Sequence, residues 1–390
     1  MKNNIKSKLK SIKLSSGYRT RKAKEFGNSR IFKYMNKEYL SFASNDYLSL
    51  SNDKRIINAA KKALDNHGYS VASSALISGY TKYHHKLEEE LSEFLGNEKT
   101  LLFSTGYQAN LGVIKSLAQR GDFIYSDRLN HASLIDGAII SRGKFKRYKH
   151  NNIKDLEKNL TLSNMNNNNM IITDSLFSMD GDIANLKQLN KKAKQHNMNL
   201  LVDEAHALGV YGRNGNGIVN SLSLNNKNNI FITGTFGKAV GTFGAFFSGK
   251  EDIVEYVLQK SRSYIYSTSL PVSAVEATRK SLKIIQKEDW RRDKLFSLIN
   301  YFKKNVKSIG YNTLKSNSQI QGIIIGDAKK TIEISNELFK KNIYIPSIRP
   351  PTVEEGKSRL RISLTVDHSE SDIDYLLNIL DTISRNLVQS

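Results

Sequence analysis

The alternation of short apolar runs with amphipathic stretches between residues 45 and 250 limits the possible folds of this chain more than any other feature. Between the runs lie helical patterns such as 106–120, in which apolar residues recur at helical spacing. The candidate strands are TLLF (100–103), DFIYS (122–126), MIITD (170–174), NLLVD (199–203), IFITG (230–234) and GAFFS (244–248). Strands that alternate with helices predict an α/β fold with a mostly parallel central sheet and helices on both faces.

The sequence pattern changes after Pro271. A long helical region reaches about residue 308, and strands near 321–326 and 359–364 precede a final helix. The first 40 residues are polar and suit a short helix and a strand pair. With 390 residues, the chain is long enough for several domains. We predict an N-terminal segment (1–44), a large domain (45–275) and a smaller C-terminal α+β domain (276–390).

Composition excludes several classes of function. The net charge is +22, but the basic residues are spread along the chain, so we expect no nucleic-acid partner. The chain has no cysteine, which excludes disulfides, thiolate catalysis and cysteine-ligated metals, and fits a reducing cytoplasm. No apolar run is long enough to span a bilayer, and the basic N-terminus has no apolar centre of a secretory signal, although a transit peptide stays open. We predict a soluble cytoplasmic protein without a metal.

Polar residues follow the candidate strands at their carboxyl ends, where open α/β sheets bind ligands. These residues are Thr105, Gly106 and Tyr107, which open a helix, then His131, Ser178, Asp203, His206, Thr235 and Lys238. Each has a structural explanation by itself: a helix start, a capping acid, a core histidine, or a lysine that extends to water. Their joint placement at one sheet edge indicates an active site.

This set of side chains suits pyridoxal 5'-phosphate. The cofactor needs a lysine for its Schiff base and an acid at its pyridine nitrogen, here Lys238 and Asp203. A lysine is costly to bury in an apolar, glycine-rich run such as 231–249, but a desolvated amine is a better nucleophile. The helix start at Thr105 can hold the phosphate through backbone N–H groups. A flat imidazole such as His131 can stack on the ring.

Six motifs of the sequence resemble those of the α-oxoamine synthases. They are SNDYLSL (44–50), SDRLNHASL (126–134), SLFSMDGD (175–182), DEAHALGVYG (203–212), TFGKAVG (235–241) and IYSTSLP (265–271). The resemblance extends from about residue 40 to 385 and keeps motif order and spacing. It implies a fold-type I pyridoxal-phosphate transferase, similar to aspartate aminotransferase, that condenses an amino acid with an acyl thioester and releases CO2. It also implies a homodimer with its sites at the interface.

The resemblance implies a role for each matching position. Lys238 forms the Schiff base and then acts as general base, Asp203 pairs with the pyridine nitrogen, and His131 stacks on the ring. The other cofactor contacts that it implies are His206 and Ser178 at the phenolic oxygen, Thr105, Gly106, Tyr107 and Thr235 at the phosphate, and Ser267 and Thr268 at the partner's phosphate. The substrate contacts that it implies are Arg361 (or Arg359) with the amino-acid carboxylate, Asn45 near the substrate, Thr352 at the acyl site, and Arg19 or Arg21 at the acyl donor.

The C-terminal element SIRPPTVEEGKSRLRISLTVDH (347–368) is most similar to the family member that uses L-alanine and a pimeloyl thioester, carried by coenzyme A or acyl carrier protein. A sister enzyme that uses glycine remains an alternative, as do an aminotransferase and a non-catalytic basic binding protein on the same fold. The chain departs from the family at 69–80, where alanine and serine replace several glycines, and at Ser49, where YLGL has become YLSL. No cofactor position is lost, so we expect an active enzyme.

Overall fold

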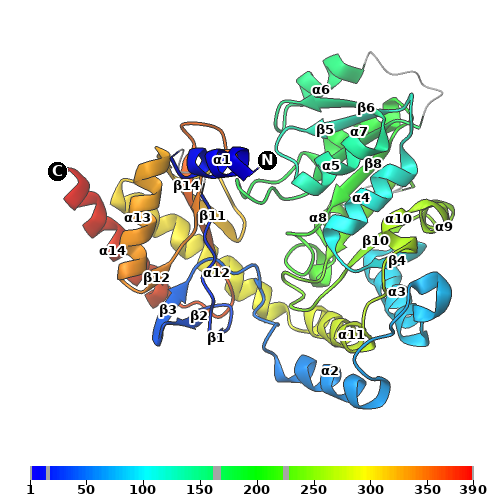
Figure 1. The fold of residues 1–390 in the computed structure, drawn as a ribbon, viewed down its shortest axis with the longest axis horizontal. Coiled ribbons are helices and arrows are strands. Elements are labelled where there is room, and N and C mark those ends of the chain that lie inside the picture. Colours follow the sequence, from blue (N-terminus) through cyan, green and yellow to red (C-terminus); the bar gives the residue numbers. More distant parts are fainter. Residues whose placement is uncertain (1, 15–17, 161–167, 223–227, 389–390) are drawn as a thin grey trace. The chain divides into compact units, whose positions relative to one another are not determined.

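A computed structural model gives the structure of the chain and describes residues 2–14, 18–160, 168–222 and 228–388. The chain divides into two compact units (Figure 1). The small unit contains residues 1–49, 179–182 and 290–390, and the large unit contains 50–178 and 183–289. These boundaries differ from the predicted segments. Residues 1–49 belong with the C-terminal residues because strand β3 (Lys37–Ser41) pairs with β12 (Ile343–Tyr344).

The large unit is built on a seven-stranded sheet with the order β4-β10-β9-β8-β7-β5-β6. Strand β10 runs antiparallel to β4 and β9, and the other neighbours are parallel, so the predicted mostly parallel sheet is confirmed. The strands are β4 (Lys99–Phe103), β5 (Phe123–Asp127), β6 (Lys144–Tyr148), β7 (Met170–Asp174), β8 (Asn199–Asp203), β9 (Ile230–Thr235) and β10 (Ala245–Gly249). The sequence did not predict β6, because this edge strand, KFKRY, has exposed basic side chains instead of an apolar run.

Helices cover both faces of this sheet, which explains why β5 and β7 are buried along their whole length. On one face, α4 (Gly106–Leu117), α5 (Ala132–Ser141) and α9 (Glu251–Lys260) pack Val113, Leu134 and Val254 into the main core. Helix α7 (Leu186–Gln195) packs against β7 and β8 with Leu186 and Leu189. The other helices of this unit are α2 (Lys54–His67), α3 (Lys82–Leu95), α6 (Ile153–Leu160), α8 (Ile218–Ser221), α10 (Arg262–Ile265) and α11 (Val272–Lys287).

The small unit contains two short sheets. One has the order β1-β2-β3-β12, with β1 (Phe26–Gly27) and β2 (Ile31–Tyr34), and the other has the order β11-β14-β13. The second consists of β11 (Ile320–Gly326), β13 (Ser347–Ile348) and β14 (Ser358–Ser363). The helices of the small unit are α1 (Lys2–Leu14), α13 (Ala328–Lys340) and α14 (Glu370–Val388), together with α12 (Asp289–Asn305), which begins at the boundary between the two units. The predicted strands near 321–326 and 359–364 and the final helix are confirmed. Within the described ranges, no helix combines the length and apolar character that a membrane span requires.

Candidate active site

The ends of the parallel strands place two carboxylates side by side. Asp174 and Asp203 are the last residues of β7 and β8 and are paired in register. Both are buried, with exposed fractions of 4% and 6%. Burial raises the pKa of Asp174 well above its usual range, and the nearby charge of Asp203 raises it further. The arrangement therefore favours the neutral form of Asp174.

Lys238 lies in the turn between β9 and β10, and its Nζ is 2.7 Å from Nε2 of His206. The turn is closed by a hydrogen bond from the Gly241 N–H to the Lys238 carbonyl (2.8 Å). Gly241 has a φ of +70°, and a Cβ there would lie 2.6 Å from the backbone nitrogen of Ser51, so glycine is required. Lys238 is half-buried, and its amine contacts an imidazole directly.

Buried hydrogen bonds hold the Asp203 carboxylate. Asn110 Nδ2 donates to its Oδ2 (2.7 Å), and the Ala205 N–H donates to its Oδ1 (2.8 Å). Asn110 projects from α4 and is 1% exposed. These two donors fix the orientation of the carboxylate at the end of β8.

His131 caps the N-terminus of α5: its Nδ1 accepts from the Ser133 N–H (3.3 Å) and lies 2.8 Å from Ser133 Oγ. The backbone N–H of His131 donates to Asp174 Oδ2 (2.7 Å). Burial lowers the pKa of His131, and the charge of Lys238 lowers it further against the opposing charge of Asp203. Ser133 Oγ, which contacts His131 Nδ1, accepts from the Asn110 amide that also donates to Asp203, so the imidazole and the acid belong to one hydrogen-bonded network. The charge of Lys238 also acts on this imidazole.

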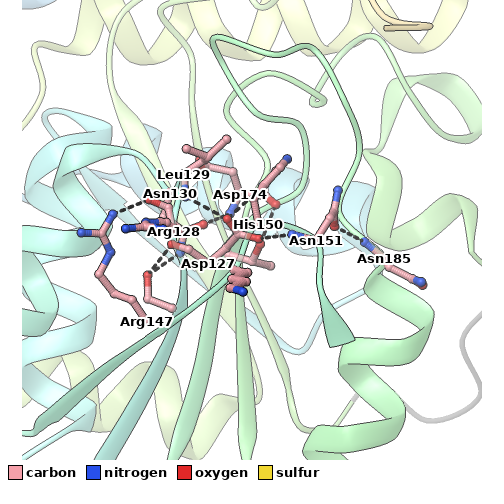
Figure 2. A network of polar contacts seen from close by, with 12 residues as sticks. Asp127, Arg128, Leu129, Asn130, Arg147, His150, Asn151, Asp174 and Asn185 are labelled. Carbon is pink, nitrogen blue, oxygen red and sulfur yellow. Dashed lines mark hydrogen bonds and ion pairs between the residues drawn. The ribbon is translucent and has the colours of Figure 1, made fainter. Parts of the chain in front are cut away.

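A polar network fixes the loop that carries His131 (Figure 2). Asp127, at the end of β5, accepts from the N–H groups of Leu129 and Asn151 (both 2.8 Å) and contacts His150 Nδ1 (2.9 Å). Asn130 Nδ2 donates to the Ile172 carbonyl (2.8 Å), and its Oδ1 accepts from the Asp174 N–H (3.1 Å). The loop is therefore tied to β5 and β7, and the position of the imidazole is set by the sheet.

The predicted phosphate site lies where α4 begins. Thr105 is the N-cap of α4, and its Oγ1 accepts from the Gln108 N–H (3.2 Å). A Cβ on Gly106 would lie 3.5 Å from the Thr235 Cβ, so the helix start and the end of β9 are neighbours. The Thr235 hydroxyl donates to the Gly244 carbonyl (3.0 Å), and the Tyr107 hydroxyl contacts Asp136. The first N–H groups of an α-helix have no acceptor within the helix, which suits an anion here.

Two further predicted contacts lie at the margins of this group. Ser178 is half-buried in the turn that follows β7. Thr268 is exposed, and its carbonyl accepts from Ser104 Oγ (3.1 Å). Gln108 Nε2 donates to Ser267 Oγ (3.4 Å), which connects the Ser267–Thr268 segment to the first turn of α4.

The predicted substrate residues belong to the small unit. Arg361 Nη2 donates to the neutral Asn45 Oδ1 (3.3 Å), and Nη1 donates to the neutral Ser363 Oγ (2.7 Å). Arg359, the alternative, forms an ion pair with Asp180 (2.7 Å). An arginine that already has a carboxylate partner is a poorer receptor for a substrate carboxylate, which counts against Arg359.

The other two predicted substrate residues, Arg19 and Thr352, are also in contact. Arg19 Nη2 lies 3.4 Å from Thr352 Oγ1, with the guanidinium as donor. The Arg349 guanidinium donates to the Tyr18 carbonyl (2.7 Å), which holds the chain beside Arg19 against the 347–352 segment. The structure therefore brings the two predicted acyl-donor contacts together.

Asp174 and Asn110 were not predicted as functional residues. Asp174 ends the strand MIITD as Asp203 ends NLLVD, so the rule that found one carboxylate would also have found the other. Asn110 gave no signal, because its partners Asp203 and Thr233 are 93 and 123 residues away in the sequence.

The 69–80 segment, which departs from the related family, forms a π-helical turn over Ala75–Gly79. Ala72 has a φ of +52°, so alanine occupies a left-handed backbone position in this segment. Gly79 remains necessary, because a Cβ there would lie 2.2 Å from the Ser73 carbonyl oxygen.

Comparisons with known proteins agree with this geometry. The family model for aminotransferase class I and II matches residues 37–380. The 8-amino-7-oxononanoate synthase of Saccharophagus degradans is 44% identical over 90% of this chain and 88% of that protein. A solved structure of serine palmitoyltransferase with a PLP internal aldimine has a TM-score of 0.92 and 29% identity, over 98% of this chain and 97% of that one. The 8-amino-7-oxononanoate synthase of Francisella tularensis has a TM-score of 0.77 and 30% identity, over 90% and 99%. The predicted fold-type I class is confirmed.

Proposed function

Because the chain belongs to the aminotransferase class I and II family, we propose that it condenses L-alanine with a pimeloyl thioester, with loss of CO2, to form 8-amino-7-oxononanoate for biotin biosynthesis. The observation that carries the proposal is the meeting of Lys238, Asp203, His131 and His206 at one sheet edge, in a chain 44% identical to a curated synthase. The comparisons favour this reaction over the sister reaction with glycine, because the curated relative is named for this product.

The enzyme depends on pyridoxal phosphate, and its residues fit that cofactor. The lysine amine, the ionised acid, the imidazoles and the helix N-terminus are the donors and acceptors that the cofactor's carbonyl, pyridine nitrogen, ring and phosphate require. When bound, pyridoxal phosphate supplies an electron sink that stabilises negative charge at Cα of the amino acid, both when a proton leaves and when CO2 leaves.

Each side chain then has one task in the proposal. Lys238 binds the cofactor carbonyl and afterwards moves the proton at the alanine Cα. Asp203 keeps a proton on the pyridine nitrogen, and His131 covers the ring. The remaining cofactor contacts are His206 and Ser178 at the phenolic oxygen and Thr105, Gly106, Tyr107 and Thr235 at the phosphate. Thr235 must turn its hydroxyl away from the Gly244 carbonyl to donate to the phosphate.

The substrates are bound by residues of the small unit in this proposal. Arg361, beside Asn45, binds the alanine carboxylate, because a guanidinium offers two parallel donors to a carboxylate. Thr352 and Arg19, which contact each other, bind the acyl donor. That donor is pimeloyl-coenzyme A or pimeloyl-acyl carrier protein, and we place the reaction in the cytoplasm.

We also propose that the enzyme is a homodimer in which Thr268 reaches the partner's phosphate. Tyr69 and Ile77 are each 82% exposed and Tyr266 is 70% exposed. Their two segments are adjacent, since Ser74 and Thr268 form a β-bridge. Large apolar side chains exposed together indicate a protein interface. Light scattering after size exclusion should give a dimer for the parent and a monomer for Ile77→Asp, while Met35→Asp, at another exposed site, should stay dimeric. A monomeric parent enzyme would refute the assignment.

The test of the reaction is a product assay. The cofactor-loaded enzyme is incubated with L-alanine and pimeloyl-coenzyme A, with glycine in a parallel sample, and the products are identified by mass spectrometry. We expect 8-amino-7-oxononanoate from alanine, and no product from Lys238→Ala. An amino ketone from glycine alone would assign the chain to the sister reaction. An α-keto acid from alanine without CO2 release would assign it to the aminotransferases.

A further inference from the structure

The buried side-chain amide of Asn110 connects two groups of the proposed cofactor site, the Asp203 carboxylate and, through Ser133, the His131 imidazole. Its Nδ2 donates to Asp203 Oδ2 (2.7 Å) and to Ser133 Oγ (2.9 Å), and its Oδ1 accepts from Thr233 Oγ1 (2.7 Å). An ionised carboxylate can only accept, so the amide nitrogen must face Asp203. Both N–H groups of the amide are thereby used inside the large unit.

The Ser133 hydroxyl connects the Asn110 amide to the imidazole of His131. The Ser133 backbone N–H donates to His131 Nδ1 (3.3 Å), so Nδ1 must carry a lone pair and no proton. Ser133 Oγ, which accepts from Asn110, lies 2.8 Å from the same Nδ1 and must therefore donate to it. Two donors on Nδ1 leave the imidazole neutral with its proton on Nε2.

We propose that Asn110 is a positioning residue that orients the Asp203 carboxylate and, through Ser133, holds His131 as a neutral imidazole protonated on Nε2. This role rests on the proposed function, because the two groups matter together only when pyridoxal phosphate lies between them. A neutral ring does not oppose the protonated pyridine nitrogen, and its Nε2–H remains available as a donor to a bound substrate.

The charges around His131 allow this state. The charge of Lys238 opposes protonation of the imidazole, while Asp203 and Asp136 favour it. Asp174 accepts from the His131 backbone N–H, and its own burial favours the neutral acid. The hydrogen bonds to Nδ1 act in the same direction as burial, because they stabilise the lone pair that protonation would remove.

The inference is tested first on the apo protein labelled with 15N-histidine, by two-bond 1H–15N correlation spectra over a pH series. The signal of His131 is assigned by its loss in His131→Gln. We expect the Nε2–H tautomer in the parent protein, and a higher His131 pKa in both Asn110→Ala and Ser133→Ala. Ser141→Ala removes a buried hydroxyl of the same helix that donates to the Ala138 carbonyl, and should leave the His131 signal unchanged. An Nδ1–H tautomer in the parent would overturn the inference.

The proposal has two branches, the orientation of Asp203 by Asn110 (the Asp203 branch) and the control of the His131 tautomer through Ser133 (the His131 branch). The affinity for the cofactor separates them. Asn110→Ala should raise the dissociation constant of pyridoxal phosphate about tenfold, because it removes one charge-assisted hydrogen bond from Asp203. Ser133→Ala leaves that bond intact and should change the constant much less. Equal affinities of parent and Asn110→Ala would refute the Asp203 branch. If Asn110→Ala does not fold, an unchanged His131 pKa in Ser133→Ala would still refute the His131 branch. Failure of the proposed reaction would show as missing product with these readouts unaffected.

Discussion

Ser49 occupies a position that the α-oxoamine synthase motif fills with glycine, and its φ is +53°. Its side chain takes part in a hydrogen-bonded cycle in the small unit. The Ser29 hydroxyl donates to Asp367 Oδ2 (2.8 Å), so it accepts from Ser49 Oγ (2.7 Å), which in turn accepts from the Asp367 N–H (3.2 Å). Backbone strain and two hydrogen bonds therefore oppose each other at this residue.

The two effects can be separated by two substitutions. Ser49→Ala keeps the left-handed backbone and loses both hydrogen bonds, at about 1 kcal/mol each, so the unfolding free energy should fall by about 2 kcal/mol. Ser49→Gly loses the same bonds but removes about 1 kcal/mol of strain, so the fall should be about 1 kcal/mol. We expect the Ser49→Gly variant to be more stable than the Ser49→Ala variant.

Urea unfolding of the apo protein measures this difference. The fluorescence of Trp290, the single tryptophan of the chain, reports on the same unit. Ser335 is the matched control: it is half-buried in α13 and donates to the Ile345 carbonyl (2.6 Å). In that helix the order should reverse, with Ser335→Ala more stable than Ser335→Gly by about 1 kcal/mol. A Ser49→Gly variant less stable than Ser49→Ala would refute the strain argument.

Three further outcomes follow from the structure. Asp203→Asn should retain the cofactor's visible absorbance but lose at least about 100-fold in kcat, since an amide cannot keep the pyridine nitrogen protonated; a normal kcat would remove Asp203 from this role. Asp180→Asn should lower the unfolding free energy of the small unit by about 3 kcal/mol, because it leaves the buried Arg359 without its ion pair; an unchanged urea midpoint in Trp290 fluorescence would contradict this. Burial raises the pKa of Glu204 to about 7 from the ordinary 4.5. The folded protein therefore binds the Glu204 proton more tightly than the unfolded chain does. The stability that this proton contributes is complete below pH 4.5 and is lost, up to about 3 kcal/mol, as pH rises through 7. When urea unfolding is followed by circular dichroism at several pH values in that range, the unfolding free energy of Glu204→Gln should fall less steeply with pH than that of the parent protein.

The central sheet and the chemistry at its edge could be predicted because their signals are local. Each strand of the large unit except β6 is a short apolar run; Asp203 ends one such run, and His131 and Lys238 lie a few residues beyond two others. Strand β6 was not predicted, because exposed lysines occupy this edge strand, and helix α13 of the small unit was not predicted either. The division of the chain was also beyond the sequence, because β3 and β12 pair across about 300 residues.

By itself the sequence determined which chemical groups the enzyme has and at which edge of the sheet they gather, since strand and helix periods and the order of the chain place them there. Only the tertiary structure decided their states. The pairing of Asp174 with Asp203, the contact of Lys238 with His206 and the contacts of Asn110 join residues far apart in the chain. Burial and hydrogen bonding of those pairs set which group is charged, and neither quantity is a property of the sequence near any one of them.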